Sequence, residues 1–258
     1  MPVTNENLKA ISVSQLSKTF ISGGVVRKVF SRFTIEFEGG AVTAIMGQSG
    51  VGKSTLLRLL AGLDAPDEGQ ITRCIESQPL RYAFQSNILL PWRTVAGNLK
   101  LSADLTGNPT DPREVQNALK RIGLSDFAGA FPSELSGGMR RRVALARTVL
   151  SDFQTILLDE PLSGVDLPLR IELLVWLRQL IGARQATSVV VMHDLEDAIQ
   201  IADRIVVLQG QPASVAVDCP IELARPTSVR AAWALRRSPG FFALAEQLAS
   251  ELLKMDKL

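Results

Sequence analysis

The hydrophobic positions near the N-terminus form short runs that suit β-strands. Residues 10–16, 33–38 and 41–46 are apolar or alternate between apolar and polar side chains, and the glycine pairs Gly23–Gly24 and Gly39–Gly40 separate them. Alternation with a period of two predicts half-buried strands, and glycine pairs are typical of the turns between them. We therefore expect strands in the first part of the chain.

A second set of apolar runs lies in the C-terminal half. Residues 155–160, 187–192 and 204–209 are rich in Val, Ile and Leu, and a helical pattern separates each run from the next. Strands that alternate with helices are typical of a parallel sheet with crossover helices, whose two faces are both buried. The pattern predicts an α/β core.

Between these two sets the pattern becomes mostly helical. Helices are predicted over Thr94–Asp104, Asp111–Ile122 and Met139–Leu150, with Pro, Gly and Ser between them. This block is expected to form an inserted helical lobe. The tail, Pro226–Leu258, is predicted to form one or two amphipathic helices whose apolar face docks on the core.

Composition narrows the class of protein. The chain of 258 residues and 28.0 kDa is 46% hydrophobic and 21% charged, as globular proteins are, and it can bury a large core. A net charge of only +2 argues against nucleic acid as a partner, because binding a duplex requires many basic side chains. No run approaches the ~20 apolar residues of a membrane span, so membrane association is expected to be peripheral. Cys74 and Cys219 match no metal-ligand spacing and are expected to be reduced thiols.

One motif predicts phosphate binding. The pattern G-x-x-x-x-G-K-[ST] lies between a predicted strand and a predicted helix, as this motif requires. Backbone amides of such a loop surround an anion, the lysine reaches the β- and γ-phosphates, and the hydroxyl that follows binds Mg²⁺. The alternative is a plain glycine-rich turn. The predicted nucleotide-binding residues are Gly47, Gln48, Ser49, Gly50, Val51, Gly52, Lys53, Ser54 and Thr55.

Two carboxylates end the apolar run at 155–160. A parallel strand that ends in Asp159 and Glu160 places both acids at the carboxyl edge of the sheet, beside the phosphate loop. We expect Asp159 to hold Mg²⁺ and Glu160 to polarise the water that attacks the γ-phosphate. Without other motifs, two acids at a strand end are more often solvated capping residues than a catalytic pair. The nearby phosphate loop makes the catalytic pair the favoured interpretation here.

The stretch LSGGMRRRVALAR, residues 135–147, resembles the signature of ATP-binding-cassette (ABC) ATPases. Ser136, Gly137 and Gly138 are expected to open a helix whose amides point at phosphate. The resemblance implies a P-loop NTPase cassette with a RecA-like parallel-sheet core, a small antiparallel β-subdomain and a helical signature subdomain. The divisions it implies are an ATP-binding core with the β-subdomain over 1–86 and 154–212, the helical subdomain over 87–153, and a strand and helical tail over 213–258.

Further residues match this family one by one. Phe20 matches the aromatic residue that stacks on adenine, and Gln85 matches the glutamine that contacts Mg²⁺ and water. Asp166 ends a loop, LSGVD, that touches the opposite subunit in the family. His193 matches the switch histidine that contacts the γ-phosphate. Met139 departs from the family, since glutamine is usual there, and it removes two hydrogen-bonding functions.

The only histidine of the chain, His193, follows the apolar run 187–192. A lone histidine is usually a surface residue or a satisfied core residue. Here the strand would end at the same sheet edge as Glu160 and the loop of Lys53. A neutral imidazole at that place can donate one hydrogen bond to the γ-phosphate and accept another, so it can sense whether that phosphate is present.

The resemblance also implies partners. Two cassettes of this family pair head to tail, and because this chain has one phosphate loop and one signature, a homodimer with two composite sites is expected. The region of Ile88, Leu89, Leu90 and Trp92 is expected either to dock a cytoplasmic helix of a membrane permease or to fill the junction of the two lobes. The chain is similar to importer cassettes for nitrate, sulfonates and taurine, which implies a peripheral place at the cytoplasmic face of the inner membrane and an extracytoplasmic solute-binding protein. A lipid-transport cassette and a soluble non-transport cassette are the alternatives.

Overall fold

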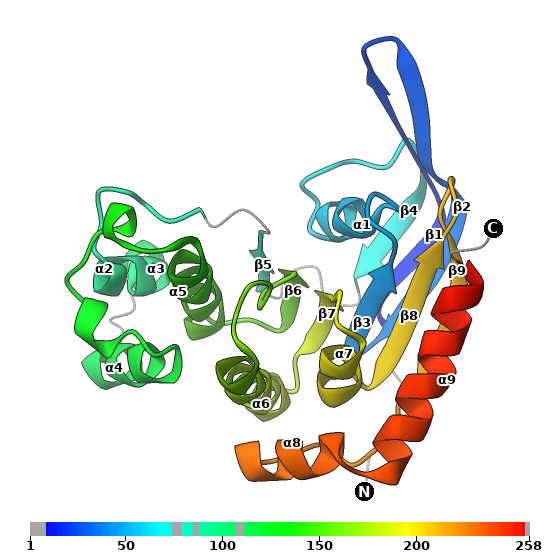
Figure 1. The fold of residues 1–258 in the computed structure, drawn as a ribbon. Helices are drawn as coiled ribbons and strands as arrows, with labels where there is room; N and C mark the ends of the chain where they lie inside the picture. The colour runs from blue at the N-terminus through cyan, green and yellow to red at the C-terminus, as the bar shows by residue number, and fades with distance from the viewer. Residues whose placement is uncertain (1–8, 74–78, 85–87, 107–110, 256–258) are drawn as a thin grey trace, which may run out of the picture.

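The computed structural model describes residues 9–73, 79–84, 88–106 and 111–255. Two β-sheets form the body of the molecule, and a group of helices, α2 to α5, stands beside them as a separate lobe (Figure 1). No helix of these described ranges is both long and apolar enough to cross a membrane.

The larger sheet has six strands in the order β5-β6-β7-β3-β8-β9. All pairs are parallel except β8 with β9, which is antiparallel and closes one edge. The parallel core agrees with the prediction, and β9 adds an antiparallel edge to it. The strands are β3 (Val42–Gly47), β5 (Leu80–Ala83), β6 (Thr155–Asp159), β7 (Thr187–Val191), β8 (Arg204–Gln209) and β9 (Ser214–Pro220).

The central strands β3, β6, β7 and β8 are buried on both faces, which explains why each is a nearly continuous apolar run. Successive residues of a strand point to opposite faces, and the two faces belong to different hydrophobic clusters. On β7, for example, Val190 joins one cluster, while Val189 and Val191 join the other. The same alternation holds on β3, where Ala44 and Ile45 lie on opposite faces.

Helices cover each face of the sheet (Figure 1). The cluster on one face includes residues of α6 (Leu167–Arg184), α7 (Leu195–Ile201) and α9 (Pro239–Met255), so the tail docks on the core as predicted. The cluster on the other face includes α1 (Lys53–Leu60) and the second sheet. The remaining tail helix, α8 (Val229–Arg236), packs on α6.

The second sheet is antiparallel, with the order β2-β1-β4. Its strands are β1 (Lys9–Ser22), β2 (Val25–Glu38) and β4 (Glu68–Arg73). The turn Gly23–Gly24, with both glycines at positive φ, joins β1 to β2 in a long hairpin whose end projects from the body (Figure 1). The predicted strands over 10–16 and 33–38 are therefore parts of the longer strands β1 and β2.

The helical lobe contains α2 (Val95–Leu99), α3 (Leu101–Thr106), α4 (Pro112–Arg121) and α5 (Gly137–Leu150). The single helix predicted over Thr94–Asp104 is wrong, because Lys100 caps α2 and a second helix follows. Asn98 holds this corner together: its buried amide donates to the carbonyls of Leu90, Arg93 and Thr94, and its Oδ1 accepts from the Leu90 amide at 2.8 Å.

One carboxylate at the start of β8 joins four segments. Asp203 accepts two hydrogen bonds from Arg178 of α6, at 2.7 and 2.8 Å, and one from the backbone amide of Val42 at 2.8 Å. Arg225 donates to it from the tail at 3.2 Å. Burial alone raises the pKa of Asp203, but the hydrogen bonds from Arg178 and Val42 outweigh it, so the pKa lies below its usual value.

We expect Asp203→Asn to lower the free energy of unfolding by about 2–3 kcal/mol at pH 7, because two guanidinium groups lose their anion. A carboxylate whose pKa is lower in the folded state stabilises it above the unfolded pKa of about 4 and loses that contribution as the pH falls further. In urea titrations the difference between wild type and variant should therefore stay constant from pH 7 to a little above pH 4 and shrink only below about pH 4. Asp218→Asn, at a more exposed pair with Arg204, should cost less than about 1 kcal/mol, and an equal loss would contradict the prediction.

Candidate functional site

The phosphate loop lies between β3 and α1, as predicted. Gly47 ends β3 and Gly52 precedes the first residue of α1, and both have positive φ, at 142° and 120°. The Lys53 ammonium donates to the carbonyls of Gly47 at 2.7 Å and Gln48 at 2.9 Å, across the loop. Val51 is buried in the hydrophobic cluster beneath the loop. The loop is therefore shaped by its own backbone, with Lys53 at its centre.

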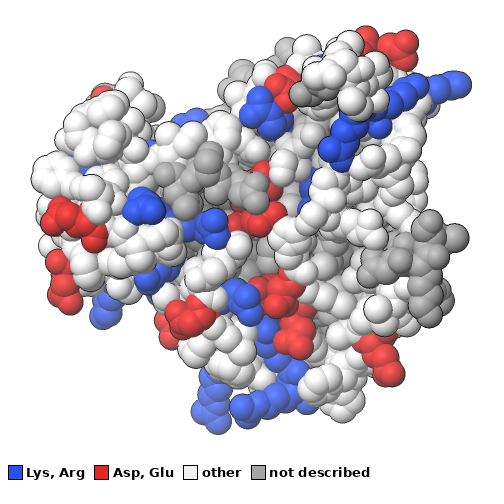
Figure 2. All heavy atoms as spheres, turned by 45° about the horizontal axis from the view of Figure 1, so that its top comes forward, with Lys and Arg blue, Asp and Glu red and all other residues white. Residues whose placement is uncertain are grey.

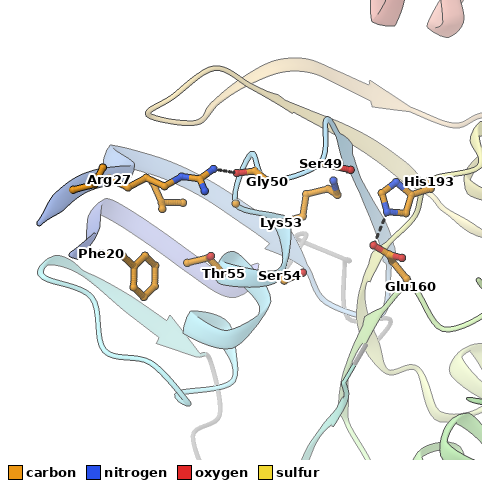
Figure 3. A pocket seen from close by; sticks show the side chains of 12 residues that line it. Phe20, Arg27, Ser49, Gly50, Lys53, Ser54, Thr55, Glu160 and His193 are labelled. Atoms are coloured by element: carbon orange, nitrogen blue, oxygen red, sulfur yellow. Dashed lines mark hydrogen bonds and ion pairs between the residues drawn. The ribbon is translucent and has the colours of Figure 1, made fainter. Parts of the chain in front are cut away.

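A cavity of about 520 Å³ opens over this loop. Phe20 lies at one end, Lys53 in the middle, and Glu160 with His193 at the other end (Figure 3). An aromatic ring, a phosphate-binding loop and a carboxylate in this order match the base, phosphates and attacking water of a nucleotide. The lining residues are Phe20, Val25, Arg27, Val29, Ser49, Gly50, Gly52, Lys53, Ser54, Thr55, Glu160 and His193.

Glu160 and His193 meet at the carboxyl edge of the sheet. The imidazole Nε2 lies 2.5 Å from Glu160 Oε1, and the Glu160 amide donates to Val191 at the end of β7 (Figure 3). Glu160 has a φ of 50°, a left-handed conformation that is costly for a residue with a side chain and that often marks a functional site. The His193 side chain is 47% exposed and that of Glu160 only 14%. The pair therefore presents an accessible imidazole beside a sheltered carboxylate.

Asp159 ends β6 and is almost completely buried. Burial raises the pKa of its carboxyl group, and a hydrogen bond from Ser54 opposes that rise. Its Oδ1 has no hydrogen-bond partner in the described part of the chain. One buried carboxylate with a free oxygen beside a hydroxyl group suits Mg²⁺, which binds proteins through few oxygen ligands and keeps water and phosphate as the others. The residues present fit this ion.

The local charges also act on Lys53. Burial lowers the pKa of its ammonium group below the ordinary value, while Glu160 and Asp159 raise it. The two carboxylates therefore favour the protonated form of Lys53, while its burial opposes that form. A bound polyphosphate would add negative charge at the same place and favour the protonated form.

The signature residues lie on the helical lobe and do not line the cavity. Ser136 caps α5 by accepting from the Met139 amide at 3.2 Å, and Gly137 begins that helix. A Cβ added to Gly138 would lie 3.6 Å from the Gly164 carbonyl oxygen, so the helix start packs against the loop that ends at Asp166. Asp166 caps α6 by accepting from the Leu169 amide at 3.4 Å. The structure thus brings the signature and this loop together, on the same chain. Gln85 and Cys74 lie outside the described residues.

The three arginines that follow Met139 on α5 face neighbouring loops and not only solvent. Each guanidinium donates to a loop carbonyl: Arg140 to Leu135 at 2.5 Å, Arg141 to Ser163, and Arg142 to Ile122 at 2.5 Å. These basic side chains therefore supply donors to loop carbonyls that have no partner in a helix or strand.

Four residues were not predicted from the sequence: Tyr82 contacts Asp159, and Val25, Arg27 and Val29 line the cavity. Val25 and Arg27 line it from the hairpin, and Arg27 donates to the Gly50 carbonyl at 2.6 Å (Figure 3). The Tyr82 hydroxyl donates to Asp159 at 3.5 Å from β5. No motif marks these residues, because their place depends on how the hairpin and β5 pack.

A phosphate loop at the edge of a parallel sheet, acids on a nearby strand and a separate helical lobe define a phosphate-loop nucleoside triphosphatase. Residues 30–163 match the family described as ABC transporter. The chain belongs to this family, and as such it is an ATP-binding and ATP-hydrolysing cassette.

Curated relatives carry a common name. The chain is 40% identical over 231 residues to the aliphatic sulfonates import ATP-binding protein SsuB 1 of Paraburkholderia xenovorans. That alignment covers 88% of this chain and 64% of that protein. It is 37% identical over 250 residues to the protein of the same name from Agrobacterium fabrum. That alignment covers 96% of this chain and 85% of that protein. The fold matches the dimeric ATP-binding cassette MJ0796, solved in a post-hydrolysis state with ADP and Pi, with a TM-score of 0.73, 26% identity, and coverage of 83% of this chain and 100% of that one.

Proposed function

We propose that this chain powers the uptake of a small solute of the sulfonate, nitrate or taurine type by hydrolysing ATP as the cassette of an importer. The observation that carries the ATPase part is the contact between Glu160 and His193 at the end of the phosphate cavity. The names of the curated relatives support import and favour an aliphatic sulfonate as the solute. The same names favour an importer over a lipid-transport cassette or a soluble cassette.

In this proposal each side chain has one task. Phe20 stacks on adenine, and Lys53 with the loop amides binds the phosphates. Asp159 and Ser54 hold Mg²⁺, with Gln85 as a further contact, and the ion supplies charge stabilisation on the phosphate oxygens. Glu160 orients and polarises the attacking water.

His193 keeps Glu160 in place and contacts the γ-phosphate. An imidazole that faces both the base and the terminal phosphate gives the site a direct response to the loss of that phosphate. The remaining loop residues contribute through their backbone, which places the amides around the anion.

We propose a two-fold homodimer. Ser136, Gly137, Gly138 and Asp166 lie away from the cavity of their own chain, which supports a role at the site of a partner cassette. A symmetric pair of such chains would complete two sites. The dimeric state of the similar solved cassette supports this arrangement.

The permease is proposed to dock beside the helical lobe. Trp92 is 72% exposed and Ile88 is 55% exposed, whereas Leu90 is half-buried and Leu89 belongs to the buried core cluster. Large exposed apolar side chains on one short segment favour a protein interface. In this proposal the chain lies at the cytoplasmic face of the inner membrane, and a solute-binding protein acts on the other side. Figure 2 shows basic and acidic side chains interspersed on the face drawn, which does not favour an extended polyanion there.

The test is to capture the tagged full-length chain from gently solubilised native membranes. We expect an integral permease and a solute-binding protein to come with it. Trp92→Asp should reduce recovery of the permease at least about tenfold, because a buried unpaired charge costs more than 1.4 kcal/mol.

Leu105→Asp is the matched control for this experiment, since Leu105 is an equally exposed leucine of the same lobe, on α3. It should leave recovery unchanged. Capture of a lipid-transfer protein, or of no membrane protein at all, would contradict the import proposal and leave only the ATPase assignment.

A further inference from the structure

The last turn of α8 carries a buried arginine. Arg236 is 7% exposed, and its side-chain hydrogen-bond partners Gln200, Glu196 and Asp197 all lie on α7. Its Nε donates to Gln200 at 2.6 Å, Nη1 to Glu196 at 3.1 Å, and Nη2 to Asp197. A buried guanidinium is tolerated only where its donors are paired, so these contacts fix the tail helix against α7.

Asp197 is shared with a second arginine. Arg170 of α6 lies 3.1 Å from the other carboxylate oxygen of Asp197 and 3.5 Å from Asp194. Burial, with the neighbouring charge of Asp194, raises the pKa of Asp197, and the hydrogen bond from Arg236 opposes that rise. Two cations from α6 and α8 therefore compensate one buried anion on α7. Removing either cation leaves this carboxylate under-compensated.

This network begins at Asp194, the residue that follows His193. Asp194 caps α7 by accepting from the Asp197 amide at 3.0 Å, and His193 directly precedes that cap. The first turn of α7 therefore fixes the path of the backbone between the end of β7 and α7, and His193 lies on that path. A cavity of about 300 Å³ is lined by Glu160, His193, Arg170, Asp194 and Asp197, so the network and the reactive pair share one space.

We propose that Arg236 is a positioning residue for His193. From the C-terminal tail it holds Asp197, and through the first turn of α7 it fixes the turn that presents the imidazole to Glu160 and to the γ-phosphate. The tail is thus part of the ATPase machinery rather than only a cover for the core. The inference rests on the proposed role of His193 in ATP turnover.

The test uses the full-length chain with a purification tag free of histidine. Because His193 is the only histidine, carbon-13-labelled histidine reports that one imidazole. We expect Arg236→Met to shift or broaden the imidazole signals, and to lower kcat for ATP about tenfold with KM changed less than about twofold, since binding groups stay in place while the reacting groups move. Arg236→Lys should restore part of the rate.

Two controls separate positioning from stability. Arg237→Met changes the exposed neighbour and should leave signals and kcat as in the wild type. Leu248→Ala removes a buried side chain from α9, so it loosens the tail without touching the network, and it should lower kcat far less than Arg236→Met at a temperature where both are folded.

The proposal is overturned if Arg236→Met leaves the imidazole signals and kcat unchanged, or if Leu248→Ala lowers kcat equally. Failure of the proposed function gives a different result: the wild-type chain itself would not hydrolyse ATP, while the imidazole signals would still report whether Arg236 positions His193.

Discussion

Glu160→Gln is expected to bind ATP as the wild type does and to hydrolyse it about 100-fold more slowly or worse. In the wild type, His193 Nε2 lies 2.5 Å from the Glu160 carboxylate. The amide of the variant keeps the shape of that side chain and can still form a hydrogen bond with His193 Nε2. It cannot accept a proton from water, and losing a general base costs about 100-fold to 10,000-fold. Phosphate release measures turnover, and equilibrium dialysis with labelled ATP measures binding.

Glu246→Gln is the matched control for this substitution. Glu246 is an exposed carboxylate on α9, away from the cavity, so turnover should stay within about twofold of the wild type. Undiminished turnover in Glu160→Gln would mean that another group acts as the base. Loss of ATP binding in the same variant would mean that Glu160 has a structural task in the cavity.

The parts of the fold that follow from local pattern could be predicted. The strands β3, β6, β7 and β8 are buried on both faces, so each must be a run of apolar residues, and such runs are visible in the sequence. The phosphate loop could be predicted because its chemistry fixes residue types at fixed spacing. The family match and the solved cassette confirm the fold class and the ATPase prediction.

The edge strands β4 and β9 are not marked by an apolar run in the sequence. The segment EGQITR forms β4 on an edge of the small sheet, where most of its side chains are exposed and no apolar run is needed. The same reason applies to β9, which alternates half-buried and exposed residues along an edge. Edge strands are stabilised by their neighbours, and neighbours far away in the sequence cannot be inferred from one chain.

Long-range polar contacts were the least predictable feature of the site. Arg236 and Asp197 are 39 residues apart, and Arg27 and Gly50 are 23 apart. Which arginine meets which acceptor depends on the packing of whole elements, and an arginine in a sequence is usually solvated. The sequence therefore predicts the groups that we propose to contact the phosphates, but it does not indicate the groups that hold them in place.

Gly47→Ala is expected to lower the free energy of unfolding by about 3–5 kcal/mol and to abolish ATP binding. Gly47 pairs with Leu208 of β8 at a φ of 142°, and an added Cβ would lie 2.3 Å from the Leu208 carbonyl oxygen. Backbone atoms of a central strand cannot move aside cheaply, and the φ angle is itself unfavourable for alanine. The loop that carries Lys53 starts at this residue, so relaxing the clash displaces the phosphate site. Urea titration measures the stability, and dialysis with labelled ATP measures the binding.

Gly182→Ala makes the same chemical change in open space, since nothing lies within 4 Å of the added Cβ and the residue is in α6. Both substitutions reduce the conformational entropy of the unfolded chain equally, so their difference reports only the folded state. In a helix alanine is preferred to glycine by up to about 1 kcal/mol, so this variant should be slightly more stable than the wild type and bind ATP normally. Equal stability of the two variants would mean that the β3 and β8 backbones separate at little cost. In that case the geometry of the phosphate loop would not depend on the close contact between Gly47 and Leu208.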